Sequence, residues 1–312
     1  MKGTNVTTMS GLCPAERNAQ LRVGFVGAGK VGVALGLHAA SHGVDVSGYT
    51  SRTQASADAA AQRTGASSFS TLRALIESTN LIFITTPDGT ISQVTGELVA
   101  AADGDLTGKV IAHASGALGS CELDAARAAG ALCASVHPLA AVSELPAGDV
   151  AACANPLSTA FFTLEGDAEA VKLAEELLDV CGNQHTCIDA ADKVRYHAAA
   201  VFMSNLVCGL ASEGLKLLEE CGFTAEQAFS ATRSLFMGNC EAIAARGPQD
   251  ALTGPVERND TTTVARHLDA LDGRKRNEYA LLSLAAADLA KSRHPERDYA
   301  PLEQMLGDAA RA

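Results

Sequence analysis

The chain has 312 residues and a formal net charge of −12 at pH 7, and 47% of its residues are hydrophobic. This composition is typical of a folded protein, and the length allows two domains with a sizeable core. The acidic balance argues against a nucleic-acid partner, because phosphate backbones are held by Lys and Arg clusters that the sequence lacks.

Residues 1–20, MKGTNVTTMSGLCPAERNAQ, are polar and predict a mobile tail. They contain no apolar stretch like that of a signal peptide, and no uninterrupted apolar run in the chain reaches the ~18 residues that a membrane span needs. The nine cysteines are scattered singly, which is typical of small buried side chains in a reducing compartment. We therefore expect a cytoplasmic protein without a membrane partner.

Short β-rich runs alternate with helical runs from Leu21 to Asp189. This alternation predicts βαβ units and an α/β fold with a doubly wound parallel sheet. The expected strands are 21–27, 44–50, 80–86, 109–115 and 131–137, with 160–166 and 184–189 in one further unit. The expected helices between them are 30–43, 56–65, 71–78, 121–130 and 167–182.

The strand pattern stops after Asp189, and residues 190–312 read as almost entirely helical. The sequence therefore predicts a doubly wound α/β domain at 21–189 and an all-α domain at 190–312. A boundary near Ser143 is the alternative, because residues 142–156 have loop composition.

The stretch VGFVGAGKVGVAL has the G-x-G-x-x-G spacing of a dinucleotide-binding loop between a strand and a helix. The first glycine permits the tight turn, the second lets the backbone approach a pyrophosphate, and the third lets helix and strand pack closely. The residues expected to contact the cofactor here are Gly27, Ala28, Gly29, Lys30, Val31 and Gly32.

The second strand ends in GYTSRTQ, where an NAD site normally carries an acid for the ribose 2′-hydroxyl. Ser51 and Arg52 stand there instead, and a guanidinium can pair with a 2′-phosphate. The sequence therefore predicts NADP, the alternative being that Arg52 is only a solvated loop charge. The turn after the third strand, with Thr85, Thr86 and Pro87, is expected to line the cofactor's other half; Pro87 is equally suited to a plain turn.

Polar side chains follow the next two strands, at the sheet edge where ligands bind in this fold. Ser115 and the Gly116 N–H are suited to hold a substrate carboxylate. His113 and His137 lie at the same edge, His137 being as well suited to a structural role. A metal site formed by His113, His137 and His197 is an alternative. Hydride transfer needs no metal, however, and we expect none.

The helix expected at 192–205, DKVRYHAAAVFMSN, places Lys193, His197 and Ser204 on one face, with Asn205 at its flank. Burying such groups without partners is costly, so the stripe indicates either structural hydrogen bonds or a catalytic role. A positioned ammonium can neutralise the charge left on oxygen or nitrogen by hydride transfer. His197 is placed to orient the substrate or relay the proton, and Ser204 and Asn205 to hold substrate oxygens.

Further along, TGPVERND runs into a helix capped by Asp260 or Thr261. Its loop arginine, Arg258, is suited to clamp an acid through two hydrogen bonds.

Several of these stretches occur together in a known group of proteins: GAGKVGVALG, SR after the second strand, TTPD, HASGALGS, HPLAA, DKVRYHAAAVFMSN and TGPVERND. From Leu21 to about Leu284 the chain resembles bacterial proteins that join a Rossmann-like domain to a helical C-terminal domain of unknown function. That group is similar to 6-phosphogluconate dehydrogenase, β-hydroxyacid dehydrogenases, ketopantoate reductase and deazaflavin-dependent NADP oxidoreductase.

The resemblance implies that Lys193 is the catalytic lysine of this superfamily. Two relatives carry Asn four residues later, where this chain has His197, and CIDAAD replaces the glycine-rich stretch before the lysine in the β-hydroxyacid dehydrogenases. It also implies a homodimer formed by the helical domain, with Arg258 in its own or the partner's site. The expected function is hydride transfer between NADPH and a small carboxylate-bearing ketone or imine. A non-catalytic NADP sensor is the alternative, and a reduced deazaflavin in place of a carbon substrate is a third reading.

Overall fold

The structure, a computed structural model, describes residues 21–142 and 155–311. The tail predicted at 1–20 lies outside these residues. The chain forms two compact units, Met1–Ser204 and Asn205–Ala312. The sequence placed the boundary at Asp189, whereas this division falls after the first helix beyond the sheet, whose first residue, Lys193, is hydrogen-bonded to Ser115 and Ser135.

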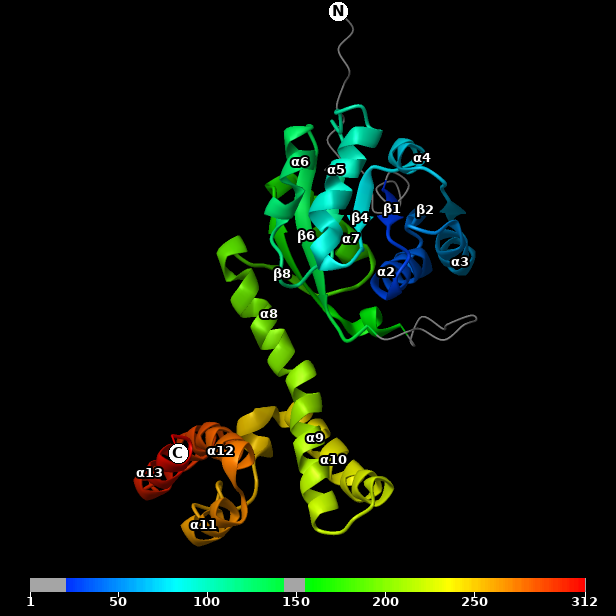
Figure 1. Cartoon of the computed structure of the whole chain (residues 1–312). Coiled ribbons are helices and arrows are strands. Elements are labelled where there is room, and N and C mark those ends of the chain that lie inside the picture. Colours follow the sequence, from blue (N-terminus) through cyan, green and yellow to red (C-terminus); the bar gives the residue numbers. More distant parts are fainter. Residues whose placement is uncertain (1–20, 143–154, 312) are drawn as a thin grey trace, which may run out of the picture. The chain divides into compact units, whose positions relative to one another are not determined.

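An eight-stranded sheet forms the centre of the first unit, in the order β3-β2-β1-β4-β5-β6-β7-β8 (Figure 1). Its central strands are apolar runs such as LIFI in β4, buried along their whole length. Neighbouring strands are parallel except β6 and β7. The strands are β1 (Arg22–Val26), β2 (Asp45–Thr50), β3 (Ser67–Ser68), β4 (Leu81–Ile84), β5 (Val110–His113), β6 (Leu132–Leu139), β7 (Phe161–Gly166) and β8 (His185–Cys187).

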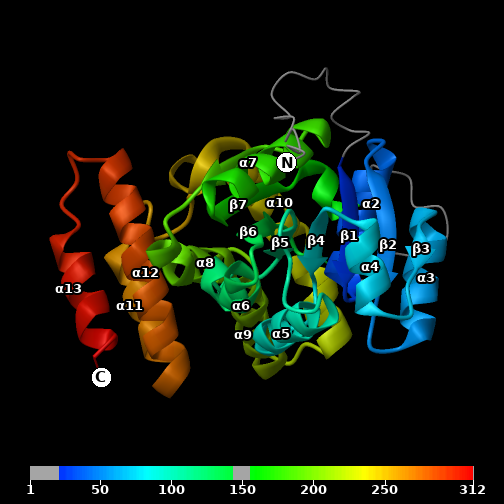
Figure 2. The same cartoon turned by 90° about the horizontal axis from the view of Figure 1, so that it is seen from above.

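Helices cover both faces of the sheet, which confirms the doubly wound class. Apolar residues of α2, α3 and α7 pack on one face, and those of α4, α5 and α6 on the other, as Figure 2 shows from above. The helices are α2 (Lys30–Ser41), α3 (Gln54–Thr64), α4 (Leu72–Ser78), α5 (Ile91–Ala101), α6 (Asp124–Ala128), α7 (Ala168–Val180) and α8 (Lys193–Phe202).

The prediction missed three features of this unit. The two-residue strand β3 is too short for a periodic signal, and α5 contains Gly96 and several β-branched residues, which lower helix propensity. The third is the direction of β7. It runs antiparallel to β6, whereas a wholly parallel sheet was expected, and a parallel connection would need a crossover helix between them.

The second unit is helical, as predicted. Val264 and Leu268 on α11 pack with Leu302 and Leu306 on α13 in a separate apolar core. Asp260 caps α11 by accepting a hydrogen bond from the Thr263 N–H at 3.0 Å, which settles the choice between Asp260 and Thr261. The helices are α9 (Asn205–Glu220), α10 (Ala225–Ala251), α11 (Thr261–Ala270), α12 (Gly273–Arg293) and α13 (Ala300–Ala309).

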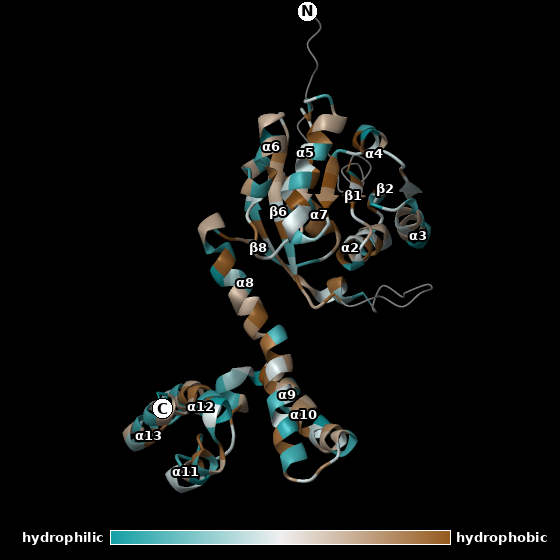
Figure 3. Ribbon diagram, in the orientation of Figure 1, coloured by the Kyte–Doolittle hydropathy of each residue, from teal (hydrophilic) through white to brown (hydrophobic). Residues whose placement is uncertain are grey.

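Large apolar side chains are exposed along the helices that follow the sheet. The ribbon of Figure 3 is coloured by hydropathy, and hydrophobic residues recur in brown along α8. The helical segment Ala190–Glu220 is long and apolar enough to cross a membrane by length and composition alone, with none of its most apolar window buried. The sequence interpretation counted uninterrupted apolar runs and did not anticipate such a segment. The exposed side chains are Val194, Phe202 and Met203 near α8, and Leu206, Leu210, Phe223, Phe229, Leu235, Phe236, Met237, Leu281 and Leu282 in the second unit.

Candidate active site

The three glycines between β1 and α2 have distinct surroundings. Gly27 has φ 109°, and a Cβ there would lie 2.9 Å from the Thr85 carbonyl carbon. A Cβ at Gly32 would lie 2.4 Å from Oγ1 of Thr85 and 2.6 Å from the Gly27 oxygen. At Gly29, the N-cap of α2, nothing lies within 4 Å of a Cβ. Packing therefore requires Gly27 and Gly32, whereas Gly29 faces open space at a helix N-terminus suited to a phosphate.

Polar groups without protein partners surround this loop. Oγ1 of Thr50 and Oγ1 of Thr86 are buried and have no hydrogen-bond partner among the described residues. Oγ1 of Thr85 donates to the Gly27 oxygen at 2.8 Å and so holds the loop. Arg52 is exposed and forms no ion pair within the described part of the chain. This edge therefore fits a dinucleotide that brings its own hydrogen-bonding groups and a phosphate.

The other predicted cofactor residues lie around the same edge. Ser51, Ala28 and Val31 are half-buried, while Lys30 and Pro87 are exposed. Lys30 opens α2, and Pro87 stands just before a short 3-10 turn at Asp88–Thr90. Their contact with a cofactor stays a prediction.

Lys193, the first residue of α8, is the most unusual side chain of the sheet edge. Only 2% of its surface is exposed. Its Nζ donates to the Ser115 backbone oxygen at 3.0 Å and to Oγ of Ser135 at 2.7 Å. An ammonium carries three hydrogens, so one is left for another acceptor. The structure therefore buries a fixed cation beside the carboxyl end of β5 and the middle of β6.

Burial lowers the pKa of the Lys193 ammonium to about 8, while the nearby carboxylates of Glu165 and Asp88 raise it. Desolvation prevails because it disfavours the charged form more than the two acids favour it. Glu165 is itself buried and accepts hydrogen bonds from the Ser120 N–H and, at 3.0 Å, from the Ser120 hydroxyl. A lysine of this kind can give up a proton near neutral pH.

Two imidazoles approach Gly116 beside this lysine. A Cβ at Gly116 would lie 2.5 Å from Nδ1 of His197 and 2.7 Å from Nε2 of His137. Nδ1 of His137 lies 2.7 Å from the Tyr196 hydroxyl, whereas Nδ1 of His197 is buried without a hydrogen-bond partner in the described structure. Burial lowers the pKa of His137 to about 4, helped by the positive charge of Lys193. His137 is therefore neutral near pH 7.

His113 and Ser115, predicted to contact the substrate, are hydrogen-bonded to protein groups at this edge. His113 is fully buried, with Nε2 3.0 Å from the Gly119 oxygen and Nδ1 accepting from the Ser115 N–H. The Ser115 hydroxyl donates to Asp88 at 2.8 Å and accepts from the Leu118 N–H. Neither side chain has a spare hydrogen for a carboxylate. These bonds hold the loop whose Ser115 oxygen accepts from Lys193, and a substrate contact by His113 or Ser115 stays a prediction.

The remaining predicted substrate residues, Ser204, Asn205 and Arg258, follow the helix α8 in the sequence. Ser204 is exposed in the turn after α8, and its hydroxyl donates to the Ala200 oxygen of that helix at 2.7 Å. Asn205 and Arg258 belong to the second unit. The loop that carries the exposed Arg258 is firmly held, because the Tyr299 hydroxyl donates to the Glu257 oxygen at 2.7 Å. A substrate contact by these three residues stays a prediction.

Four residues of the cluster escaped the sequence interpretation, although each lies in a stretch that it singled out. Tyr196 stands between the two predicted catalytic residues, and Asp88 closes the TTPD turn. Ser135 and Glu165 alternate with apolar residues in strands, which marks polar side chains on a buried face. That these residues belong to the cluster is seen only from their contacts, because a strand pattern does not show which polar side chain lies next to Lys193.

Comparisons with known proteins agree with this architecture. Residues 5–138 match the model of a Rossmann-like domain, and residues 160–286 match a domain of unknown function, DUF2520. A search of curated proteins found no significant match.

Several solved structures share the fold. Protein BF3122 from Bacteroides fragilis is 19% identical, with a TM-score of 0.66, and protein TM1727 from Thermotoga maritima is 22% identical, with a TM-score of 0.65; each match covers 87% of this chain and 99% of the other. Plasmodium falciparum pyrroline carboxylate reductase with NADP bound is 13% identical, with a TM-score of 0.54, and covers 88% of this chain and 96% of its own. At these identities the likeness is one of fold. The chain thus combines a Rossmann-like domain with a DUF2520 domain.

Proposed function

We propose that the protein is an NADP-dependent oxidoreductase that transfers hydride between NADPH and a small carboxylate-bearing ketone or imine. The observation that carries this proposal is the buried Lys193, held by Ser115 and Ser135 with one hydrogen left over. A protein that only senses a nucleotide has no need of a buried ammonium with a lowered pKa at the edge where ligands bind.

NADP is the proposed cofactor because of the groups around the glycine loop. Gly29 leaves the N-terminus of α2 open to a pyrophosphate, Thr50 and Thr86 offer unpaired hydroxyls, and Arg52 is available for a 2′-phosphate. The Plasmodium falciparum reductase, which shares the fold, is a structure with NADP bound. When bound, NADPH supplies the hydride.

Lys193 supplies the proton in this proposal. Reduction of a C=O or C=N bond places negative charge on the oxygen or nitrogen, and the free hydrogen of the Lys193 ammonium is donated to that atom. Ser115 and Ser135 keep the ammonium in place throughout. His197, whose Nδ1 has no protein partner among the described residues, and the Gly116 backbone are the neighbouring groups that orient the substrate.

The proposal is tested with the purified full chain and NADPH against a panel of 2-keto acids and cyclic imino acids. Loss of the nicotinamide absorbance is followed, with the same compounds lacking the carboxylate as matched controls. Turnover of a carboxylate-bearing member supports the proposal. NADPH binding without turnover of any compound favours the alternative, a non-catalytic NADP sensor. If only a reduced deazaflavin is turned over, the deazaflavin takes the place of the carboxylate-bearing ketone or imine as the substrate.

We further propose that the protein is a homodimer and that a second copy covers the apolar helices of the second unit. Leu235 on α10 is 73% exposed and is accompanied by Phe229, Phe236 and Met237 on the same helix. Several large apolar side chains exposed on one helix are typical of a helix that another protein surface covers. The seven described cysteines are all free, which supports a cytoplasmic location.

Light scattering in detergent-free buffer tests the dimer. The expected mass is twice that of the chain. Leu235→Asp should shift the mass to that of the monomer. Leu235→Met keeps the apolar surface and should leave the mass unchanged. A monomeric parent protein, or one that floats with phospholipid vesicles, would contradict the proposal.

A further inference from the structure

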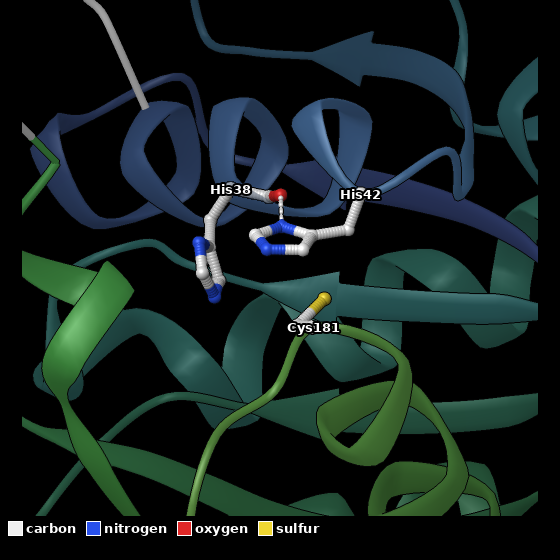
Figure 4. Close-up of side chains that lie close together, drawn as sticks. All are labelled: His38, His42 and Cys181. Carbon is white, nitrogen blue, oxygen red and sulfur yellow. Dashed lines mark hydrogen bonds between the residues drawn. The ribbon is translucent and has the colours of Figure 1, made fainter. Parts of the chain in front are cut away.

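A second cluster of metal-ligating side chains lies at the opposite end of α2 from the glycine loop. The sequence HAASH places His38 and His42 one turn apart, and Cys181 is the C-cap of α7, which packs on the same face of the sheet. One nitrogen of each imidazole and the Cys181 sulfur all lie within 4.8 Å of one another. Figure 4 shows the Cys181 side chain directed toward the two rings.

The two histidines are oriented by hydrogen bonds outside this cluster. Nδ1 of His42 lies 2.8 Å from the His38 backbone oxygen, so this nitrogen carries the proton and Nε2 keeps its lone pair. Nε2 of His38 lies 2.6 Å from Oδ1 of Asn183. Metal-binding histidines are typically held in this way by a carbonyl or amide partner.

Burial and exposure are also distributed as a metal site requires. His38 is 4% exposed and Cys181 is 5% exposed, whereas His42 is exposed at the surface. The two buried ligands exclude competing water, and the exposed one gives a cation a path of entry. The site also lies at the C-terminal end of a helix, where the backbone carbonyls favour positive charge.

We propose that His38, His42 and Cys181 bind a divalent transition-metal cation of the zinc class, with one coordination position open. Two imidazoles and a thiolate are donors that bind zinc well, whereas magnesium and calcium are bound by oxygen ligands. Zn–N and Zn–S bonds of about 2.0 and 2.3 Å place ligand atoms roughly 3.5 Å apart, so the cluster has to contract slightly around the ion. The exposed His42 ring is free to make that adjustment.

Asn183 fixes the tautomer of His38. Its Nδ2 donates to the Leu157 and Ala160 oxygens at 2.8 and 3.1 Å. Because both amide hydrogens are used, Oδ1 accepts and Nε2 of His38 is protonated in the metal-free protein. Nδ1 of His38 then keeps its lone pair for the cation, as Nε2 of His42 does, and binding displaces the proton of the Cys181 thiol.

The proposed role is a clamp between α2 and α7, distinct from the hydride-transfer chemistry. The 12 residues of α2 span about 18 Å, with the cofactor loop at one end and the metal site at the other. A cation here would fix the helix whose N-terminus holds the pyrophosphate. Metal binding is therefore expected to raise the melting temperature without being required for turnover.

Cobalt titration of the metal-free full chain tests the site, because a Co²⁺–thiolate bond gives a charge-transfer band in the near ultraviolet. We expect a 1:1 complex with this band, displaced by Zn²⁺, and a higher melting temperature in Zn²⁺. His42→Ala removes an exposed ligand with little risk to folding, and Cys181→Ser removes the thiolate. Each should weaken binding by more than the ~10–100-fold typical for an outer partner, and Cys181→Ser should also abolish the band.

Cys187→Ser is the matched control, because Cys187 is an exposed cysteine on the neighbouring strand β8. It should bind Co²⁺ as the parent does. The proposal is overturned if the parent shows no thiolate band, if Cys187→Ser loses the band, or if both ligand variants bind as tightly as the parent. Cys181→Ser and His42→Ala should each retain NADPH binding, which separates this result from the proposed cofactor site.

Discussion

Nζ of Lys193 lies 2.7 Å from Oγ of Ser135, and this hydrogen bond ties the first turn of α8 to strand β6. The Ser135 hydroxyl in turn donates to the Ser115 oxygen at 3.3 Å, which also accepts from Lys193 at 3.0 Å. The three groups form a closed set of hydrogen bonds between two strands and a helix. Because packed secondary structure fixes the ammonium, little reorganisation is needed when it meets a developing negative charge.

Lys193→Met tests the role of that ammonium. The variant keeps the aliphatic stem and loses the proton donor, so we expect the rate of NADPH-dependent reduction to fall by ~10²–10⁴-fold. Two hydrogen bonds are lost, but so is the cost of a buried charge, and the free energy of unfolding should change by no more than about 2 kcal/mol. NADPH affinity, which depends on the glycine loop, should be retained.

Steady-state rates, NADPH fluorescence titration and thermal melting measure these three quantities. Undiminished turnover in a variant that still folds and binds NADPH would show that Lys193 has only a structural role.

The pKa of Lys193, lowered by burial to about 8, predicts the pH dependence. Reduction requires the protonated ammonium, so kcat should be constant well below pH 8 and fall as pH rises through that value. Oxidation of the product requires the neutral amine and should rise over the same range. A pH profile of kcat in both directions checks this, and parallel profiles in the two directions would contradict it.

Glu165→Gln is expected to shift that profile. The Glu165 carboxylate raises the pKa of Lys193, so its removal should move the descending limb of the reductive profile to lower pH. The amide oxygen still accepts from Ser120, which limits the structural damage. Asp124→Asn, an exposed acid that does not influence Lys193, is the control and should leave the limb in place.

The fold could be predicted further than the site. The strands and the glycine loop are local patterns, because a buried parallel strand reads as an apolar run and G-x-G-x-x-G requires only one turn. The direction of β7 could not be predicted, since it depends on the connection from β6 rather than on the strand's own residues.

The polar residues of the site illustrate the same limit. The spacing of Lys193 and His197 predicted that they share one helical face. In the structure, His197 lies beside Gly116, and Lys193 is hydrogen-bonded to Ser135 on strand β6. Whether Ser115 offers its hydroxyl to a substrate depends on Asp88, 27 residues earlier in the chain, which takes that hydrogen. Such a competition between distant residues leaves no periodic signal in the sequence.

Arg52→Ala tests the choice of NADP. We expect loss of the preference for NADPH over NADH by ~1–3 kcal/mol, because a charge-assisted contact with the 2′-phosphate is removed. Fluorescence titration with both nucleotides measures it. Arg73→Ala, which removes an exposed arginine of α4 paired with Asp103, should bind both nucleotides as the parent does. Equal affinities for NADPH and NADH in the parent protein would refute the NADP assignment.

Gly29→Ala and Gly32→Ala should fail in different ways, which tests the glycine loop. A Cβ at Gly29 meets nothing within 4 Å, whereas one at Gly32 would lie 2.4 Å from Oγ1 of Thr85. We therefore expect Gly29→Ala to melt like the parent but to bind NADPH at least ~10-fold more weakly, a loss of ~1.4 kcal/mol. Gly32→Ala should be destabilised by ~1–3 kcal/mol through overpacking. Gly96→Ala on α5, where a Cβ also meets nothing within 4 Å, is the control for both measurements. If Gly29→Ala binds NADPH with the parent's affinity, the pyrophosphate does not approach the backbone at this residue, and the proposed placement of the cofactor is wrong.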